Sequence, residues 1–285
     1  MYFSRRTVVI ASLTLALVGA ALVYAAGSVL SAPANRAVPP APADLQAQTV
    51  EFAQVHGWLV STGRPGPCVV LMHGVGADRS SMVERARWLK SLGYSSLLFD
   101  FQAHGETPGE KITFGYREAA NAHAAVTFLR HSGLCTKVAG IGQSMGGAAS
   151  LLGPEPLPVD ALVLESVYPS IEQAVRDRME RVLGFGGIYL APLLYEQIPL
   201  RIGVPLSALH PADAVRDLRC PVFVLGGTAD LSTHADETQH LFANAPAPKE
   251  LWLVPGAGHV DLFRFAGAEY QRRVGSFLNS TIGAR

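Results

Sequence analysis

Three side chains of this sequence are of the types that together activate a serine nucleophile. Ser144 lies within the sequence GQSMG, Asp230 ends the sequence GGTAD, and His259 ends the sequence GAGH. A serine hydroxyl is a poor nucleophile at neutral pH and needs a base, and the base needs a carboxylate that fixes its tautomer. We therefore expect His259 to be the base, Asp230 to orient it, and Ser144 to form an acyl-enzyme that water releases.

Each of these three residues follows a short apolar run that is typical of a β-strand. The runs cover residues 138–141, 221–225 and 251–254. Glycines stand two positions before and two after Ser144, where any Cβ would obstruct a close crossing of strand and helix. The pattern predicts a nucleophile elbow, in which Ser144 occupies a strained turn between a strand and a helix.

With these motifs the chain resembles the α/β-hydrolase superfamily. It is most similar to the serine-hydrolase branch that includes dienelactone hydrolases and prolyl-oligopeptidase-type catalytic domains. The resemblance covers about residues 50–280 and is also carried by residues 57–59 (GWL), 73–74 (HG) and 99–107 (FDFQAHGET). The chain departs from the family pattern at Gln102 and Ala103, where relatives have Arg-Gly, and at Thr107 and Asn121, so the resemblance gives no substrate.

The resemblance implies an α/β fold with a mainly parallel eight-stranded sheet and helices on both of its faces. A small lid insertion is expected between strands six and seven, at about residues 166–219, where it either contacts the substrate or is an ordinary pair of packing helices. The oxyanion hole is expected from the backbone N–H groups of Val75 and Met145. His73 is interpreted as a residue that shapes the loop beside that hole.

Two other carboxylates compete with Asp230 for the role of the acid. Asp236 is interpreted as a solvated helix residue, and Glu165 ends a predicted strand where some relatives carry an alternative acid. Asp230 is preferred because it directly follows a strand-end turn and leaves room for one helix and one strand before His259.

Two further functions stay open beside ester or thioester hydrolysis. One is acyl transfer in the cell envelope, and the other is a non-catalytic, membrane-anchored binding protein on the same fold. The expected partner is a small-molecule acyl substrate, with no cofactor and no metal. The 23 basic and 23 acidic side chains balance and form no basic patch, which argues against nucleic acid as a partner. The oligomeric state stays open.

The three cysteines, Cys68, Cys135 and Cys220, have no metal-type spacing. Cys68 and Cys135 precede two strands that are neighbours in the expected fold. A disulfide between them is conceivable in an oxidising compartment, and three buried free thiols are the alternative.

The N-terminal segment differs in composition from the rest of the chain. Arg5 and Arg6 precede residues 7–30, which are uncharged and exceed the ~20 apolar residues that span a bilayer. Residues 1–30 therefore predict an uncleaved signal-anchor, with a cleaved signal peptide or a buried helix as alternatives. The prolines within residues 31–44 predict an extended tether to a hydrolase domain at 45–285. The positive-inside rule would place that domain outside the cytoplasm, in the periplasm or cell envelope, or secreted if the segment is cleaved.

Overall fold

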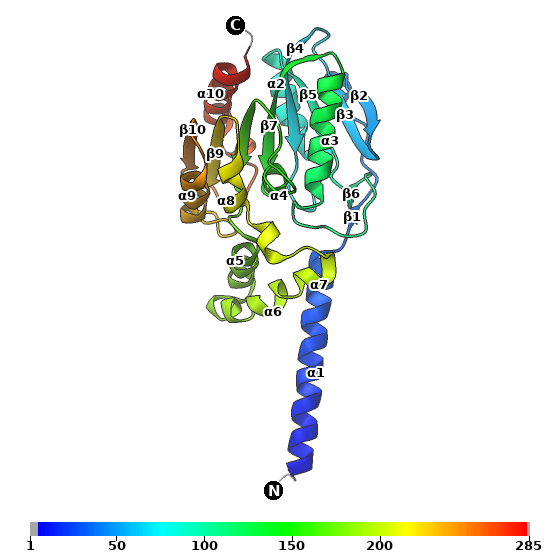
Figure 1. The fold of residues 1–285 in the computed structure, drawn as a ribbon, viewed down its shortest axis with the longest axis vertical. Coiled ribbons are helices and arrows are strands. Elements are labelled where there is room, and N and C mark those ends of the chain that lie inside the picture. Colours follow the sequence, from blue (N-terminus) through cyan, green and yellow to red (C-terminus); the bar gives the residue numbers. More distant parts are fainter. Residues whose placement is uncertain (1–4, 284–285) are drawn as a thin grey trace.

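A computed structural model describes residues 5–283 of the protein, without the side chains of residues 7–9, 11–12 and 15–16. The described residues form an eight-stranded sheet with the strand order β10-β9-β8-β7-β4-β5-β3-β2 (Figure 1). β3 runs antiparallel to both of its neighbours, and every other neighbouring pair in this sheet is parallel. The prediction of a mainly parallel eight-stranded sheet is confirmed.

The strands of the sheet differ in burial according to their place in it. β4, β5, β8 and β9 are almost entirely buried, as expected of strands covered on both faces, whereas the edge strands β2 and β10 keep partly exposed positions. The bounds are β2 (Gln48–Phe52), β3 (Val55–Val60), β4 (Gly66–Met72), β5 (Ser95–Phe99), β7 (Cys135–Gln143), β8 (Ala161–Glu165), β9 (Val222–Gly227) and β10 (Lys249–Val254).

Helices cover both faces of the sheet and enclose two apolar cores. Val70 and Met72 of β4 belong to the core under α3 (Glu118–His131), α4 (Met145–Ala149) and α9 (Ala235–Asn244). Val69 and Leu71 belong to the opposite core, under α2 (Val83–Ser91) and α10 (Leu262–Ile282). This alternation follows from the two-residue period of a strand.

The insertion between β8 and β9 consists of one long helix followed by short helical segments. We call residues 166–221 the lid. Its elements are α5 (Ile171–Leu183), η3 (Phe185–Tyr189), α6 (Ala191–Tyr195), α7 (Ile198–Ile202), η4 (Leu206–Leu209), α8 (Pro211–Ala214) and η5 (Val215–Asp217). Ile198, Ile202 and Leu209 are buried and join the lid to the core.

The N-terminal segment forms helix α1 (Arg5–Leu30), which projects away from the domain (Figure 1). Within the described residues, the structure contains no helix with the length and apolar character needed to cross a membrane. The predicted membrane anchor is therefore not supported. The buried-helix alternative is wrong, because most described side chains of α1 are exposed. Near its C-terminal end α1 contacts the lid, where Arg201 bonds Ser28 Oγ at 2.6 Å.

Residues 31–44, expected to be an extended tether, lie along the domain. β1 (Ala34–Asn35) pairs with β6 (His104–Gly105), and Arg36 Nε lies 2.6 Å from Asp78 Oδ2. The short helix η1 (Ala43–Leu45) follows, and its Leu45 is fully buried. These contacts fix the segment against the sheet.

Cys68 and Cys135 form a disulfide with their Cα atoms 5.5 Å apart, and Cys220 is a buried free thiol. The bridge joins β4 to its neighbour β7. Of the two alternatives raised for the cysteines, the structure has the disulfide.

Candidate active site

Ser144 stands between the end of β7 and the start of α4, with φ 50° and ψ −116°. A positive φ is costly for a residue with a Cβ and persists only where the surroundings impose it. One contact that helps to hold this conformation is the hydrogen bond from the backbone N–H of Ser144 to the carbonyl of Glu165, at 2.7 Å. The sharp, strained turn expected of a nucleophile elbow is present.

The glycines around Ser144 are required by close backbone contacts. A Cβ on Gly142 would lie 2.6 Å from Gly147 Cα, and a Cβ on Gly146 would lie 2.6 Å from the carbonyl oxygen of His73. No other residue type would allow α4 to approach the ends of β7 and β4 this closely.

Asp230 and His259 are joined by a hydrogen bond of 2.9 Å between Oδ2 and Nδ1. Asp230 is buried, and its Oδ1 accepts the backbone N–H groups of Ser232 and Thr233 at 2.8 and 3.0 Å. Burial acts to raise the pKa of Asp230, but the hydrogen bond and charge of His259, with these two N–H groups, outweigh it and hold that pKa below its ordinary value. An ionised Asp230 makes Nδ1 the protonated ring nitrogen and leaves Nε2 of His259 able to take a proton.

The loops that carry the acid and the histidine pack directly on each other. The N–H of Ala229 donates to the carbonyl of Ala257 at 2.9 Å. A Cβ on Gly227 would lie 3.0 Å from the carbonyl oxygen of Gly258. The glycines of GGTAD and GAGH thus allow the two loops to approach closely enough for the Asp230–His259 bond.

The loop expected to form half of the oxyanion hole lies beside Ser144. A Cβ on Gly74 would be 3.7 Å from Ser144 Cβ, and Val75 follows with a half-exposed side chain. On the other side, α4 begins at Met145, so the N–H of Met145 is among the first donors of a helix, which have no acceptor within it. Both N–H groups expected to hold an oxyanion therefore belong to segments that border Ser144.

His73 holds this loop in shape. Complete burial lowers the pKa of His73 to about 3, so its ring is neutral. Nε2 accepts the N–H of Phe101 at 3.2 Å, which makes Nδ1 the donor to the carbonyl of Gly74 at 2.8 Å. The loop-shaping role expected of His73 agrees with these contacts.

Comparisons with known proteins agree with this geometry. A profile of the Alpha/beta hydrolase family matches residues 69–270, well over half of the chain. The chain belongs to the alpha/beta hydrolase family. An uncharacterized protein of Mycobacterium tuberculosis is 30% identical over 253 residues, which cover 87% of this chain and 83% of that protein.

Other relatives of the hydrolase have more specific names. A polyketide transferase of a Penicillium species is 22% identical over 262 residues, covering 76% of this chain and 89% of its own. A solved structure of an esterase from Pyrococcus furiosus is similar with a TM-score of 0.74 and 23% identity, covering 89% of this chain and 99% of that one. At this identity the structural likeness shows the fold alone.

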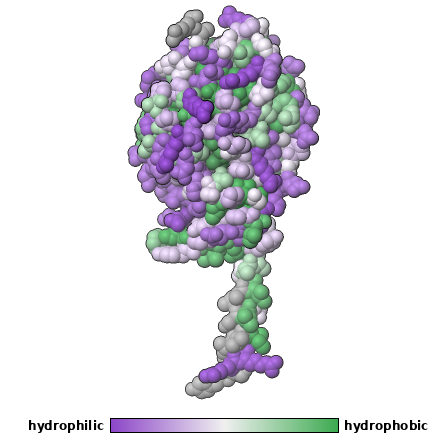
Figure 2. All heavy atoms as spheres, in the orientation of Figure 1, coloured by the Kyte–Doolittle hydropathy of each residue, from purple (hydrophilic) through white to green (hydrophobic). Residues whose placement is uncertain are grey.

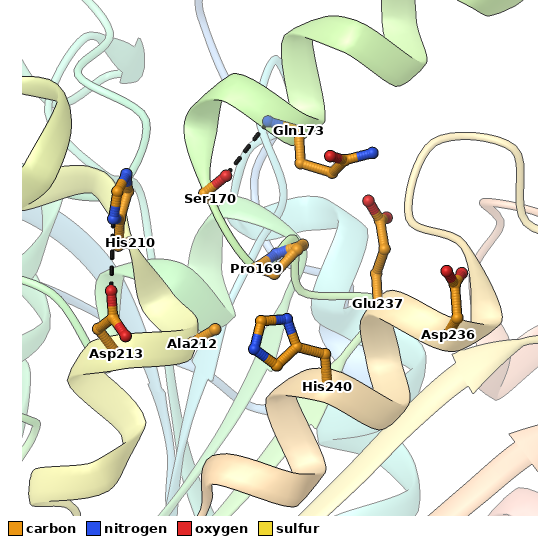
Figure 3. Close-up of a pocket in the computed structure, with 9 residues that line it drawn as sticks. All are labelled: Pro169, Ser170, Gln173, His210, Ala212, Asp213, Asp236, Glu237 and His240. Carbon is orange, nitrogen blue, oxygen red and sulfur yellow. Dashed lines mark hydrogen bonds and ion pairs between the residues drawn. The ribbon is translucent and has the colours of Figure 1, made fainter.

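The two alternative acids have other surroundings in this hydrolase. Glu165 accepts hydrogen bonds from Arg85 and from the hydroxyl of Tyr270. Asp236 lines a pocket of about 370 Å³ between α9 and the lid. Figure 3 shows Asp236 on α9, across the pocket from Ser170 of the lid. In the described part of the chain, the carboxylate that meets His259 is that of Asp230.

One buried residue beside the site gave no signal in the sequence. Arg85 of α2 is 1% exposed, and its Nη2 lies 2.6 Å from Glu165 Oε2 and 2.7 Å from Asp261 Oδ1. Asp261 stands two residues after His259, and its side chain caps α10 by accepting the N–H of Phe263 at 3.1 Å. Arginine side chains are rarely fully buried, so the sequence gives no indication that Arg85 lies inside the core.

Among the described residues, no group of three or more histidine, cysteine, aspartate or glutamate side chains is arranged to hold a metal ion.

Proposed function

We propose that this hydrolase cleaves a carboxylic ester or thioester through an acyl-enzyme at Ser144. The observation that carries the proposal is the buried Asp230 carboxylate bonded at 2.9 Å to His259, in a fold that holds Ser144 at a strained elbow. This is the set of groups that a serine nucleophile needs, in the chain order typical of the family.

The chemistry follows from the roles of these groups. His259 Nε2 takes the proton of Ser144 Oγ as Oγ bonds to the substrate carbonyl carbon. The N–H groups of Met145 and Val75 hold the resulting oxyanion, and one such donor lowers the barrier by ~3–4 kcal/mol. The intermediate collapses and expels the alcohol or thiol, which leaves with the proton from His259. Water then attacks the acyl-enzyme by the same steps and releases the acid.

Apolar side chains border the catalytic residues and favour an apolar acyl group. Val75, Leu231 and Val260 are 49%, 60% and 43% exposed. Each directly follows a residue of the site, namely Gly74, Asp230 and His259. Exposed apolar side chains around a polar centre are typical of ligand sites.

Acyl transfer to an alcohol or amine is the second candidate, and the similarity to a polyketide transferase favours it. Both reactions use the same acyl-enzyme and differ in the acceptor. Product analysis with and without added alcohols separates them.

We propose further that the catalytic domain works in an oxidising compartment outside the cytoplasm. The disulfide between Cys68 and Cys135 supports this, since such bridges persist in oxidising compartments and are rare in the cytosol.

The experiment that tests the function uses the full chain, a fluorophosphonate probe and p-nitrophenyl esters of increasing acyl length. The expected result is covalent labelling of Ser144, hydrolysis that increases with acyl length, and loss of both in Ser144→Ala with little change in melting temperature. Labelling that persists in Ser144→Ala would place the nucleophile elsewhere, and a folded protein that reacts with neither reagent would favour the non-catalytic binding protein.

A further inference from the structure

The lid exposes a group of large apolar side chains to solvent. Seven of them lie between residues 182 and 200, with Phe185 67% and Leu200 91% exposed. We call this group the lid surface; its members are Val182, Leu183, Phe185, Tyr189, Leu190, Leu193 and Leu200. Figure 2 shows apolar residues gathered on the part of the domain beside α1, where Figure 1 places α5, α6 and α7. Apolar groups of this size on a protein surface mark interaction sites.

The backbone of the lid holds these side chains outward. After α5 the chain reverses at Gly184, and η3 packs back on α5 so closely that a Cβ on Gly187 would lie 2.6 Å from the carbonyl carbon of Met179. The rings of Phe185 and Tyr189 meet edge to face, with their centroids 5.8 Å apart, and both are exposed. The apolar surface is thus built into the turn.

The charged residues next to the lid surface indicate what covers it. Arg176, Arg178 and Arg181 of α5 are exposed, against one exposed acidic residue of that helix, Glu180. Arg178 lies one turn before Val182, on the same side of α5. Apolar and aromatic side chains bordered by arginines are the composition that enters the interface of a bilayer with anionic lipids.

The neighbouring part of α1 continues this surface. α1 contacts α6, and its exposed Tyr24 lies under the guanidinium of Arg201, 4.2 Å from the ring centroid. Tyrosine and arginine at one level are typical of side chains at a membrane–water interface.

We propose that the lid surface docks on a lipid bilayer that contains anionic headgroups. The apolar side chains of η3 and α6 enter the interface, and the arginines of α5 contact the headgroups. This docking uses side chains of the domain itself. It is separate from the chemistry at Ser144.

The docking face can be identified with a fluorophore at one position. Phe185→Cys, labelled with an environment-sensitive dye, is compared with Leu92→Cys, which places the same dye at an exposed apolar position after α2. The native cysteines do not compete for the dye, because two form the disulfide and Cys220 is buried. On phosphatidylcholine vesicles that contain phosphatidylglycerol, the emission of the dye at 185 should shift to shorter wavelength, while that at 92 stays unchanged.

Affinity for the vesicles supplies the second measurement. Phe185→Ser/Tyr189→Ser should weaken vesicle binding by about tenfold or more, since each large apolar side chain removed from water contributes more than a factor of ten at full burial. The matched control Leu92→Ser/Phe265→Ser also replaces two exposed apolar side chains and should bind as the parent chain does. Ser144→Ala should bind vesicles normally, so failure of the docking proposal and failure of the proposed hydrolase are read from different experiments.

Three outcomes would overturn the proposal. An unchanged dye at 185 on vesicles that bind the protein would place the contact elsewhere. Equal binding to vesicles of phosphatidylcholine alone would remove the role of the anionic headgroups. A dye shift that depends on protein concentration without vesicles would identify a second copy of the chain as the occupant.

Discussion

Arg85 donates to Asp261 at 2.7 Å and to Glu165 at 2.6 Å, and so connects two segments of the candidate active site. The backbone carbonyl of Glu165 holds the N–H of Ser144, and Asp261 stands two residues after His259. One buried guanidinium therefore lies between the segment that fixes the nucleophile and the loop that carries the base.

Replacing Arg85 should impair both stability and catalysis. In Arg85→Met the carboxylate of Glu165 stays buried without its counter-charge, and removing one partner of a buried ion pair costs ~3–5 kcal/mol of unfolding free energy. Arg85→Met/Glu165→Gln removes both charges and should recover most of that stability, while kcat stays low because Asp261 no longer holds the loop of His259. Denaturant unfolding and ester kinetics check this, with Arg273→Met, which breaks a more exposed pair with Glu269, as the control. If the double variant had the kcat of the parent chain, Arg85 would contribute to stability alone.

Asp230→Asn should lower kcat by about four orders of magnitude, as loss of the orienting carboxylate does in serine proteases. The amide offers no charge to stabilise the imidazolium and favours the wrong tautomer of His259. Asp236→Asn is the matched control and should leave kcat nearly unchanged, because Asp236 lines the pocket between α9 and the lid. If Asp236→Asn were the inactive variant, the assignment of the acid would be wrong.

The residues of the candidate active site could be picked out from the sequence because their signals are local. A glycine-bearing turn at the end of an apolar run fixes where a side chain emerges, and this holds for Ser144, Asp230 and His259. Arg85 and Glu165 are 80 positions apart, and an arginine inside a core contradicts the usual pattern. The contacts of residues 31–44 with the domain are also non-local, since Ala34 pairs with His104.

The departures from the family pattern also have structural partners. The backbone N–H of Gln102 donates to Asn121 Oδ1 at 2.8 Å, and Gln102 Nε2 donates to Glu118 Oε1 at 2.6 Å. Two of the residues that depart from the family pattern, Gln102 and Asn121, are thus joined by a direct hydrogen bond. Such a pairing is visible only once α3 is placed beside this loop.

Asp177 of the lid and Glu237 of α9 should make stability fall as pH rises. Both are buried, and Asp177 Oδ2 and Glu237 Oε1 have no partner if both groups are ionised, whereas a shared proton joins them. Burial, followed by the charge of Asp177, raises the pKa of Glu237 to about 8. The folded chain then keeps a proton that the unfolded chain releases, so this stabilisation is complete below about pH 4.5 and is lost as pH approaches 8.

Glu237→Gln should remove that dependence. Unfolding free energy measured by denaturant between pH 5 and about 8 should fall less steeply in the variant than in the parent chain. Asp236→Asn, next to it on α9, is the control for loss of a nearby carboxyl group. Identical slopes in Glu237→Gln and the parent chain would exclude a shared proton between the lid and α9.

The disulfide between Cys68 and Cys135 should contribute strongly to stability. The bridge closes a sequence separation of 67 residues between two adjacent strands, and a loop of this length restricts the unfolded chain by about 4 kcal/mol. Cys68→Ala/Cys135→Ala should therefore lower the unfolding free energy by up to that amount and make the melting temperature insensitive to reductant. Cys220→Ala, which changes a buried free thiol, should keep the reductant sensitivity of the parent chain. The prediction would be contradicted if reductant opened the bridge, as shown by thiol titration, without changing the melting temperature of the parent chain. The two strands would then hold their register without the covalent link.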